Sequence, residues 1–208
     1  MIEPSLAISP FPTPIWVFDL PEMEAINAAL ATSLLAEAAR VPSVQRSNIG
    51  GWHSAPDLSR RSDPMIQRLM QTIIDQVDAG IGGFAAGVGV TELPRFRYAL
   101  TAWAMIMRDG DYVVPHDHGD AHWSSAYYVD AGEPGPAPAG RLAFLDPRRS
   151  VRAIPGLPLF PSVFDIAPRT GSLVIFPAWL QHHVYPYRGG RPRICISCNV
   201  TVDVADPR

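Results

Sequence analysis

Gly110-Asp-Tyr-Val-Val-Pro-His-Asp-His118 is the most informative segment of this sequence, because it places two histidines two residues apart at the end of a strand-like run. Side chains at positions i and i+2 of an extended strand share one face, so His116 and His118 can hold one metal ion together. A third imidazole, His182, can reach that ion only if the chain between folds back, as antiparallel strands do. The segment therefore predicts an antiparallel β-fold with a metal site.

Two sets of ligands could complete this site. In the first, His116, His118 and His182 form a face of three histidines. In the second, Asp120 replaces His116, which gives the face of two histidines and one carboxylate that is usual at non-haem ferrous sites. We favour the first set, because Gly119 begins a turn that carries Asp120 out of the strand.

The chain has six histidines, and the other three are weaker candidates for this site. His53 lies in a glycine-rich turn and could be a ligand, a substrate contact or a surface residue; we favour the surface position. His122 is a candidate for the mouth of the pocket. Alternation along a strand turns His183 away from its neighbour, so we expect it on the outer face.

A second motif is the strand-like run from Arg193 to Val200, in which polar and apolar residues alternate. If the apolar face packs against the core, Arg193 projects into the mouth of the barrel. Its planar guanidinium is suited to bidentate hydrogen bonds with a carboxylate. The run also contains Cys195 and Cys198, whose offset of three puts them on opposite faces, so we expect two free thiols.

Composition excludes several classes of function. The formal charge is −3 and no basic run is present, which argues against a nucleic-acid partner. All 17 basic residues are arginine, so there is no lysine for a Schiff base or a P-loop. No window approaches the roughly 20 apolar residues that a membrane-spanning helix needs, and no signal peptide is evident, so we expect a soluble, cytoplasmic protein.

The order of predicted elements indicates one domain, residues 1–208, in which an extended arm and helices (1–94) precede a β-rich core (95–208). Prolines make the first twenty residues an arm or edge strand. Helices are expected from Pro21 to Arg40 and from Pro64 to just before Gly80. Strands are expected at 96–107, 123–129, 141–145, 172–176 and 193–200. This pattern predicts a mainly β protein with flanking helices, whose core is a jelly roll.

Nearly the whole chain resembles a known family, the 2-oxoglutarate and Fe(II)-dependent oxygenases of bacteria and phages. Most members of this family are described as uncharacterised proteins. The matching segments are Phe11-Pro-Thr-Pro-Ile-Trp, Ser47-Asn-Ile-Gly-Gly-Trp-His-Ser, Pro115-His-Asp-His, Leu142-Ala-Phe-Leu-Asp-Pro-Arg, Phe176-Pro-Ala-Trp-Leu-Gln-His and Arg193-Ile-Cys-Ile-Ser-Cys-Asn. The spacing before His116 is also similar to the first motif of cupins, although the downstream glutamate of that motif is absent.

The resemblance implies a double-stranded β-helix, or cupin-like jelly roll, that binds Fe(II) and uses 2-oxoglutarate as cosubstrate. It maps His116, His118 and His182 to the iron positions and Arg193 to the cosubstrate carboxylate. Tyr128, or its neighbour Tyr127, and Asn199 are candidates to hold the cosubstrate or line the pocket. We expect Trp123 and Trp179 to be core aromatics and Arg148 to form a structural ion pair.

The implied activity is hydroxylation of a small-molecule or peptide substrate that the sequence does not identify. Two alternatives remain open: a cupin-like metalloprotein that uses no 2-oxoglutarate, and a non-catalytic small-molecule binding module. A homodimer is compatible with the sequence.

Overall fold

The structure is a computed structural model that describes residues 11–148, 152, 154–157 and 160–205. The elements, in chain order, are β1 (Trp16–Asp19), the 3-10 helix η1 (Pro21–Met23), α1 (Glu24–Ala38), β2 (Asn48–Ile49), β3 (Trp52–His53), the 3-10 helix η2 (Leu58–Arg60), α2 (Pro64–Gly87), β4 (Phe96–Met107), β5 (Tyr112–His116), β6 (Trp123–Asp130), β7 (Leu142–Leu145), β8 (Val163–Ile166), β9 (Ser172–Pro177), β10 (His182–Val184) and β11 (Arg193–Val204).

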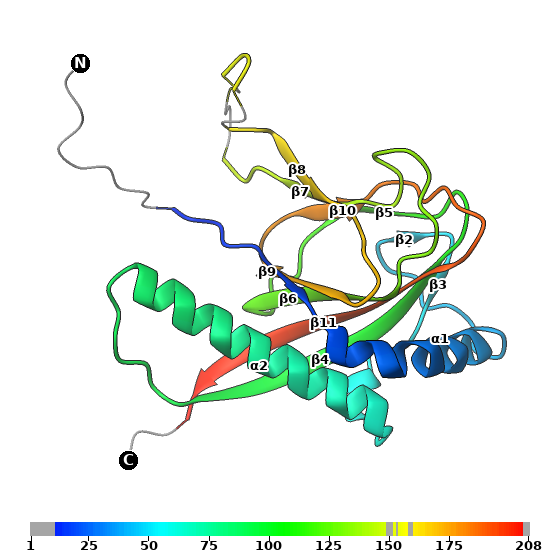
Figure 1. Ribbon diagram of the computed structural model, residues 1–208, viewed down its shortest axis with the longest axis horizontal. Coiled ribbons are helices and arrows are strands. Elements are labelled where there is room, and N and C mark those ends of the chain that lie inside the picture. Colours follow the sequence, from blue (N-terminus) through cyan, green and yellow to red (C-terminus); the bar gives the residue numbers. More distant parts are fainter. Residues whose placement is uncertain (1–10, 149–151, 153, 158–159, 206–208) are drawn as a thin grey trace.

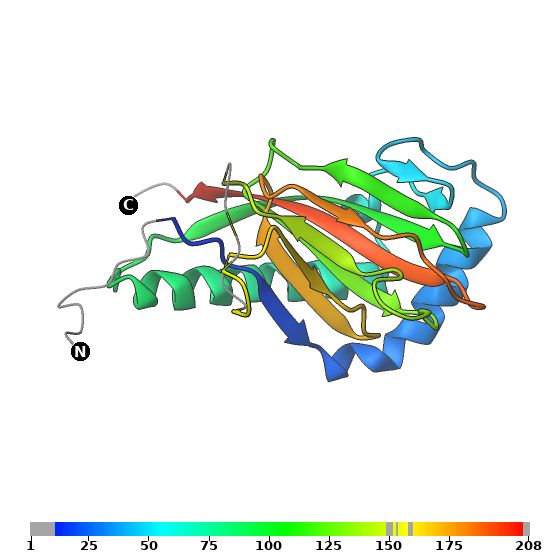
Figure 2. The ribbon, with the colours of Figure 1, turned by 90° about the horizontal axis from the view of Figure 1, so that it is seen from above.

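The strands form two facing antiparallel sheets. One has six strands in the order β1-β9-β6-β11-β4-β3, and the other has five in the order β2-β5-β10-β7-β8. Both α-helices lie on the outer side of the six-stranded sheet, as Figure 1 shows, and Figure 2 shows its strands running roughly side by side above α2. The predicted fold class, a mainly β jelly roll with flanking helices, is confirmed.

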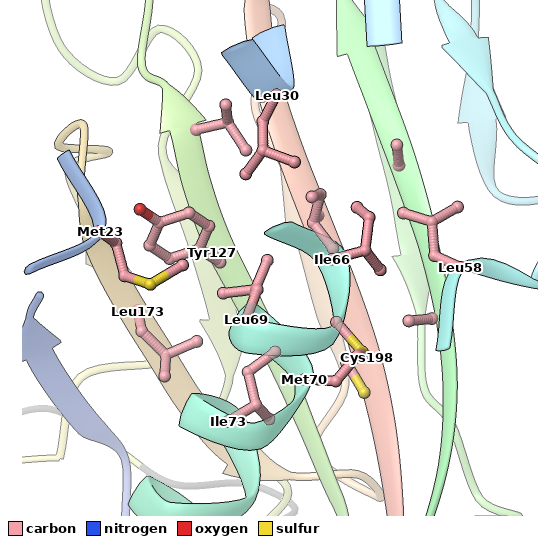
Figure 3. Close-up of a cluster of buried hydrophobic side chains, with 14 of the residues drawn as sticks. Met23, Leu30, Leu58, Ile66, Leu69, Met70, Ile73, Tyr127, Leu173 and Cys198 are labelled. Carbon is pink, nitrogen blue, oxygen red and sulfur yellow. The ribbon is translucent and has the colours of Figure 1, made fainter. Parts of the chain in front are cut away.

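The larger core lies between the helices and the six-stranded sheet. Leu69 and Ile73 of α2 are completely buried there with Met23 and Tyr127 (Figure 3). The hydroxyl of Tyr127 donates a 2.7 Å hydrogen bond to Asn27 of α1, so the polar end of this ring is also satisfied. The helices therefore close one face of the sheet and leave the opposite face to line the interior of the sandwich.

Helix α2 begins as its sequence predicts but ends later. The side chain of Asp63 accepts hydrogen bonds from the backbone N–H groups of Met65 and Ile66, at 2.8 and 3.3 Å, and Pro64 occupies the first turn. The prediction that the helix stops before Gly80 was wrong, because it continues to Gly87. A Cβ at Gly80 would clash with the ring of Trp16, so this glycine permits close packing instead of ending the helix.

The alternation along β11 is confirmed. Ile194, Ile196 and Cys198 face the helices, whereas Cys195 packs in a second cluster between the two sheets. Both cysteines are buried and free, as predicted, and burial raises the pKa of each thiol. The polar stripe that begins at Arg193 therefore faces the interior of the sandwich.

The other elements agree with the sequence in part. β1 is an edge strand paired with β9, as expected for the proline-rich arm, whereas residues 1–10 of that arm lie outside the described residues. All five predicted strands are present, but the short strands β2, β3 and β8 were not predicted. In the described part of the chain, no helix is long and apolar enough to cross a membrane.

Shortening a fully buried side chain of α2 tests the packing of this helix on the sheet. We expect Leu69→Ala to lower the free energy of unfolding by about 2–5 kcal/mol, because it removes apolar burial and leaves a cavity. Urea unfolding measures the change. Gln71→Ala, on the exposed side of the same helix, is the control and should change stability by less than about 0.5 kcal/mol. Equal losses in the two variants would contradict the packing described here.

Candidate active site

Three histidines meet at one end of the sandwich. His116 is the last residue of β5 and His182 the first of β10, and these two residues are paired across the sheet. His118 was expected on the same strand as His116 but lies just beyond its end, where its backbone N–H donates to the carbonyl of Ala178 at 2.8 Å. One ring nitrogen of each histidine lies within 4.8 Å of the others, and the described residues contain no other such group of three His, Cys, Asp or Glu side chains.

Hydrogen bonds fix which nitrogen is available in two of these rings. Nδ1 of His116 lies 2.9 Å from the carbonyl oxygen of Val114, and Nδ1 of His182 lies 2.9 Å from that of Leu180. A carbonyl can only accept, so each Nδ1 carries the proton and donates. In the neutral rings Nε2 therefore keeps its lone pair, as a metal ligand requires.

Burial keeps the three rings neutral at physiological pH. It lowers the pKa of His182 to about 3 and that of His118 to about 4, and the neighbouring His116 lowers both further. The pKa of His116 is also lowered, again mainly by burial. No proton has to be displaced before a cation binds at pH 7, because the charged form of each imidazole is disfavoured.

The histidines line a cavity of about 540 Å³ between the two sheets, and Arg193 lines it too. The side chain of Arg193 is almost completely buried, with its guanidinium carbon 4.9 Å from the ring centre of Tyr128. Its Nη1 contacts Met107 Sδ at 3.3 Å, a weak acceptor. Nε of Arg193 and the hydroxyl of Tyr128 are buried without a hydrogen-bond partner among the described residues.

These unpaired donors favour an anion in the cavity. A buried donor without a partner costs roughly 1–3 kcal/mol, and more if it is charged. Burial raises the pKa of Tyr128 to about 12, so its hydroxyl is a neutral donor. No carboxylate of the described residues forms an ion pair with Arg193. A small carboxylate ligand would satisfy both side chains at once.

Asn199 lines the same cavity from further along β11. It accepts a 3.0 Å hydrogen bond from the hydroxyl of Ser124. Six residues of strand separate it from Arg193, a distance of roughly 20 Å. One small carboxylate cannot contact both, so the geometry supports Asn199 as a lining residue.

His53 is a residue whose environment the sequence did not predict. The expectation of a surface position was wrong, because His53 is only 5% exposed and lines the cavity. Its Nδ1 lies 2.7 Å from the carbonyl oxygen of Ser54, and its ring stacks on that of Trp103. The paired glycines before Trp52, both with positive φ, were the signal of the tight β2–β3 turn that positions it.

The remaining candidates lie at the edge of the cavity or outside it. Asp120 is exposed and lines the cavity, but it is not part of the histidine group. His122 is exposed and accepts a hydrogen bond from the backbone of Val202, and it does not line the cavity. His183 packs against Tyr185 on the side away from the cavity, as expected.

The sequence predicted an ion pair for Arg148 and core positions for Trp123 and Trp179, and two of these three predictions agree with the structure. Arg148 forms the expected ion pair, with Asp146. Trp123 packs on the ring of Trp16 beside the core, as expected. The expectation of a core position for Trp179 was wrong, because half of its surface is exposed.

Comparison with known proteins adds a family and a fold. The family described as "Putative 2OG-Fe(II) oxygenase" matches residues 101–199. Similar solved structures include a prolyl-4-hydroxylase from Pseudomonas putida, with 17% identity, a TM-score of 0.59, and coverage of 90% of this chain and 91% of that chain. HygX from Streptomyces hygroscopicus, solved with nickel and 2-oxoglutarate, has 14% identity, a TM-score of 0.60, and coverage of 91% and 83%.

A prolyl hydroxylase from Trichoplax adhaerens, solved with a peptide of hypoxia inducible factor, is similar to the same extent, with 14% identity, a TM-score of 0.60, and coverage of 90% of this chain and 83% of that chain. At such identities the structural similarity shows the fold alone, which is the double-stranded β-helix. No curated protein matches the chain. The family match runs from within β4 to within β11 and includes all three histidines and Arg193, so this part of the chain is similar to the 2OG-Fe(II) oxygenases.

Proposed function

We propose that this protein is an Fe(II)- and 2-oxoglutarate-dependent dioxygenase that hydroxylates a small molecule or a peptide residue. His116, His118 and His182 are the proposed metal ligands, and Arg193 with Tyr128 binds the distal carboxylate of 2-oxoglutarate. Residues 1–208 act as one domain in this proposal, with 95–208 as the catalytic core. The family match over residues 101–199 supports the reaction class.

The observation that carries the residue assignments is the presence of two complementary groups in one cavity. Three neutral imidazoles offer nitrogen ligands to a cation, and a buried guanidinium offers donors to an anion. 2-Oxoglutarate joins these two features, because its oxo-acid end chelates a metal while its other carboxylate remains free. A histidine in place of the usual carboxylate ligand makes the metal face neutral, which favours binding of this dianion.

The chain's own residues have separable roles in this reaction. The carbonyls of Val114 and Leu180 orient two imidazoles through Nδ1, so Nε2 faces the shared position. Arg193 and Tyr128 fix the depth and direction of the cosubstrate. When bound, ferrous iron and 2-oxoglutarate with dioxygen supply oxidative decarboxylation to succinate and CO2, coupled to insertion of one oxygen atom into the substrate.

The buried arginine also bears on the two alternatives. A cupin-like metalloprotein without an oxo acid would not need a charged group here, and burying an unpaired guanidinium is costly. A non-catalytic module would need neither Arg193 nor three converging imidazoles. A cytoplasmic location, the absence of a nucleic-acid partner and a homodimeric state remain proposals that rest on the sequence.

Removing the guanidinium tests the cosubstrate site. Anaerobic titration of the Fe(II) protein with 2-oxoglutarate should produce the weak visible charge-transfer band of the metal chelate. We expect Arg193→Ala to weaken 2-oxoglutarate binding about 10- to 100-fold, because a charge-assisted hydrogen bond is worth about 1.5–3 kcal/mol. Arg148→Ala is the matched control, since that arginine is exposed and paired with Asp146. Unchanged affinity in Arg193→Ala would remove this residue from the cosubstrate site.

Substitution of His182, compared with substitution of its neighbour His183, tests the assignment of the metal ligands. We expect His182→Gln to lose most of its bound iron on desalting and to form no succinate from 2-oxoglutarate, because one of three ligands is gone. His183→Gln should retain both properties, since His183 faces away from the cavity. Metal analysis and succinate assays measure the two outcomes. Full iron retention in His182→Gln, with folding confirmed by circular dichroism, would contradict the assignment.

A further inference from the structure

The three histidines are not held in the same way. His116 and His182 each have an Nδ1–H that donates to a backbone carbonyl, which fixes the orientation of the ring. The backbone of His118 is anchored through Ala178 and Ala121, but its imidazole forms no hydrogen bond with the described residues. A ligand ring without such a partner can rotate about its side-chain bonds, so something else has to hold it.

Outside the group of three histidines, Trp103 is the aromatic neighbour of His118 among the described residues. It comes from β4 in the six-stranded sheet, whereas His118 follows β5 in the opposite sheet. The two ring centres are 5.4 Å apart with the planes inclined at 53°. Trp103 is buried and lines the cavity, so this contact reaches across the interior of the sandwich.

The indole is itself supported by His53. The two rings are nearly parallel, with an angle of 11° and centres 5.7 Å apart, which is an offset stack. The hydrogen bond from Nδ1 to the Ser54 carbonyl fixes the imidazole of His53. Ser54 also forms two hydrogen bonds with Ala104. The backbone N–H of Ser54 donates to the carbonyl of Ala104 at 3.0 Å, and the hydroxyl of Ser54 accepts from the backbone N–H of Ala104 at 2.9 Å. The backbone positions of both stacked rings are therefore fixed by these hydrogen bonds, because Ser54 follows His53 and Ala104 follows Trp103.

We propose that the stack of His53 on Trp103 positions His118 as a metal ligand, in place of the carbonyl hydrogen bond that orients the other two histidines. The inference rests on the proposed function, because it requires a metal at the three histidines. His53 and Trp103 act as positioning residues through packing, and neither contacts the metal. The stacked face of His53 matters in this role, not its second nitrogen.

Titration with Co(II) alone, followed by its ligand-field absorption bands, tests this without any substrate or turnover. Trp103→Leu should weaken Co(II) binding about 10- to 100-fold, the usual effect of losing a group that orients a ligand. It should also shift the bands, because the geometry at His118 changes. His53→Ala should weaken binding by about three- to tenfold. His53→Phe restores a stacked ring and should bind Co(II) within about twofold of the wild type.

Phe176→Leu is the matched control, because Phe176 lies 4.7 Å from the ring of His182, which already has its carbonyl partner. It should leave the affinity for Co(II) and the band positions nearly unchanged. Thermal unfolding of each metal-free variant separates loss of folding from loss of positioning. A loss of affinity in Phe176→Leu as large as that in Trp103→Leu would show general loosening and overturn the proposal.

The remaining outcomes separate this proposal from the one on which it rests. Failure of the wild-type protein to bind Co(II) at all would count against the metal site itself. Normal binding by the wild type and by folded Trp103→Leu would leave the metal site standing and remove the positioning role. Equal weakening in His53→Phe and His53→Ala would assign the effect to the imidazole nitrogen, which also overturns the stack.

Discussion

The pairing of β10 with β5 is the constraint on which the candidate site depends. It sets His182 opposite His116 and so joins two imidazoles that are far apart in the chain. Because side chains alternate along a strand, a slip of one residue would turn His182 outward and bring His183 into the cavity. The register is maintained on the other side of β10 by β7, where His182 is paired with Phe144. The chemistry of the site is therefore a property of the sheet as much as of the histidines.

The two helices contribute to the site without touching it. They cover one face of the six-stranded sheet with apolar side chains, which leaves the opposite face to form the cavity. Successive side chains of β11 point to opposite faces of this sheet. Ile194 and Ile196 point toward the helices, and Arg193 and Cys195 point toward the cavity. The same strand thus stabilises the core and holds a buried positive charge in place.

Local patterns in the sequence predicted the elements whose signals lie within a few residues. Alternation in β11, the cap at Asp63 and the histidine pair are of this kind. The end of α2 was missed because Gly80 weakens a helix in isolation, whereas here packing against Trp16 compensates. His53 was missed for a related reason, since β3 has only two residues and is formed by its pairing with β4. The position of Trp103 beside His118 depends on the approach of two sheets, which no local pattern encodes.

The neutral, all-nitrogen face has a consequence for metal selectivity. Affinities of such ligands for divalent ions follow the Irving–Williams order, in which Fe(II) ranks below Ni(II), Cu(II) and Zn(II). A carboxylate ligand would add hard oxygen character and favour iron somewhat more. If three imidazoles hold the ion, the identity of the bound metal is decided by which ions the surroundings supply, and zinc or copper would compete with iron for the same position.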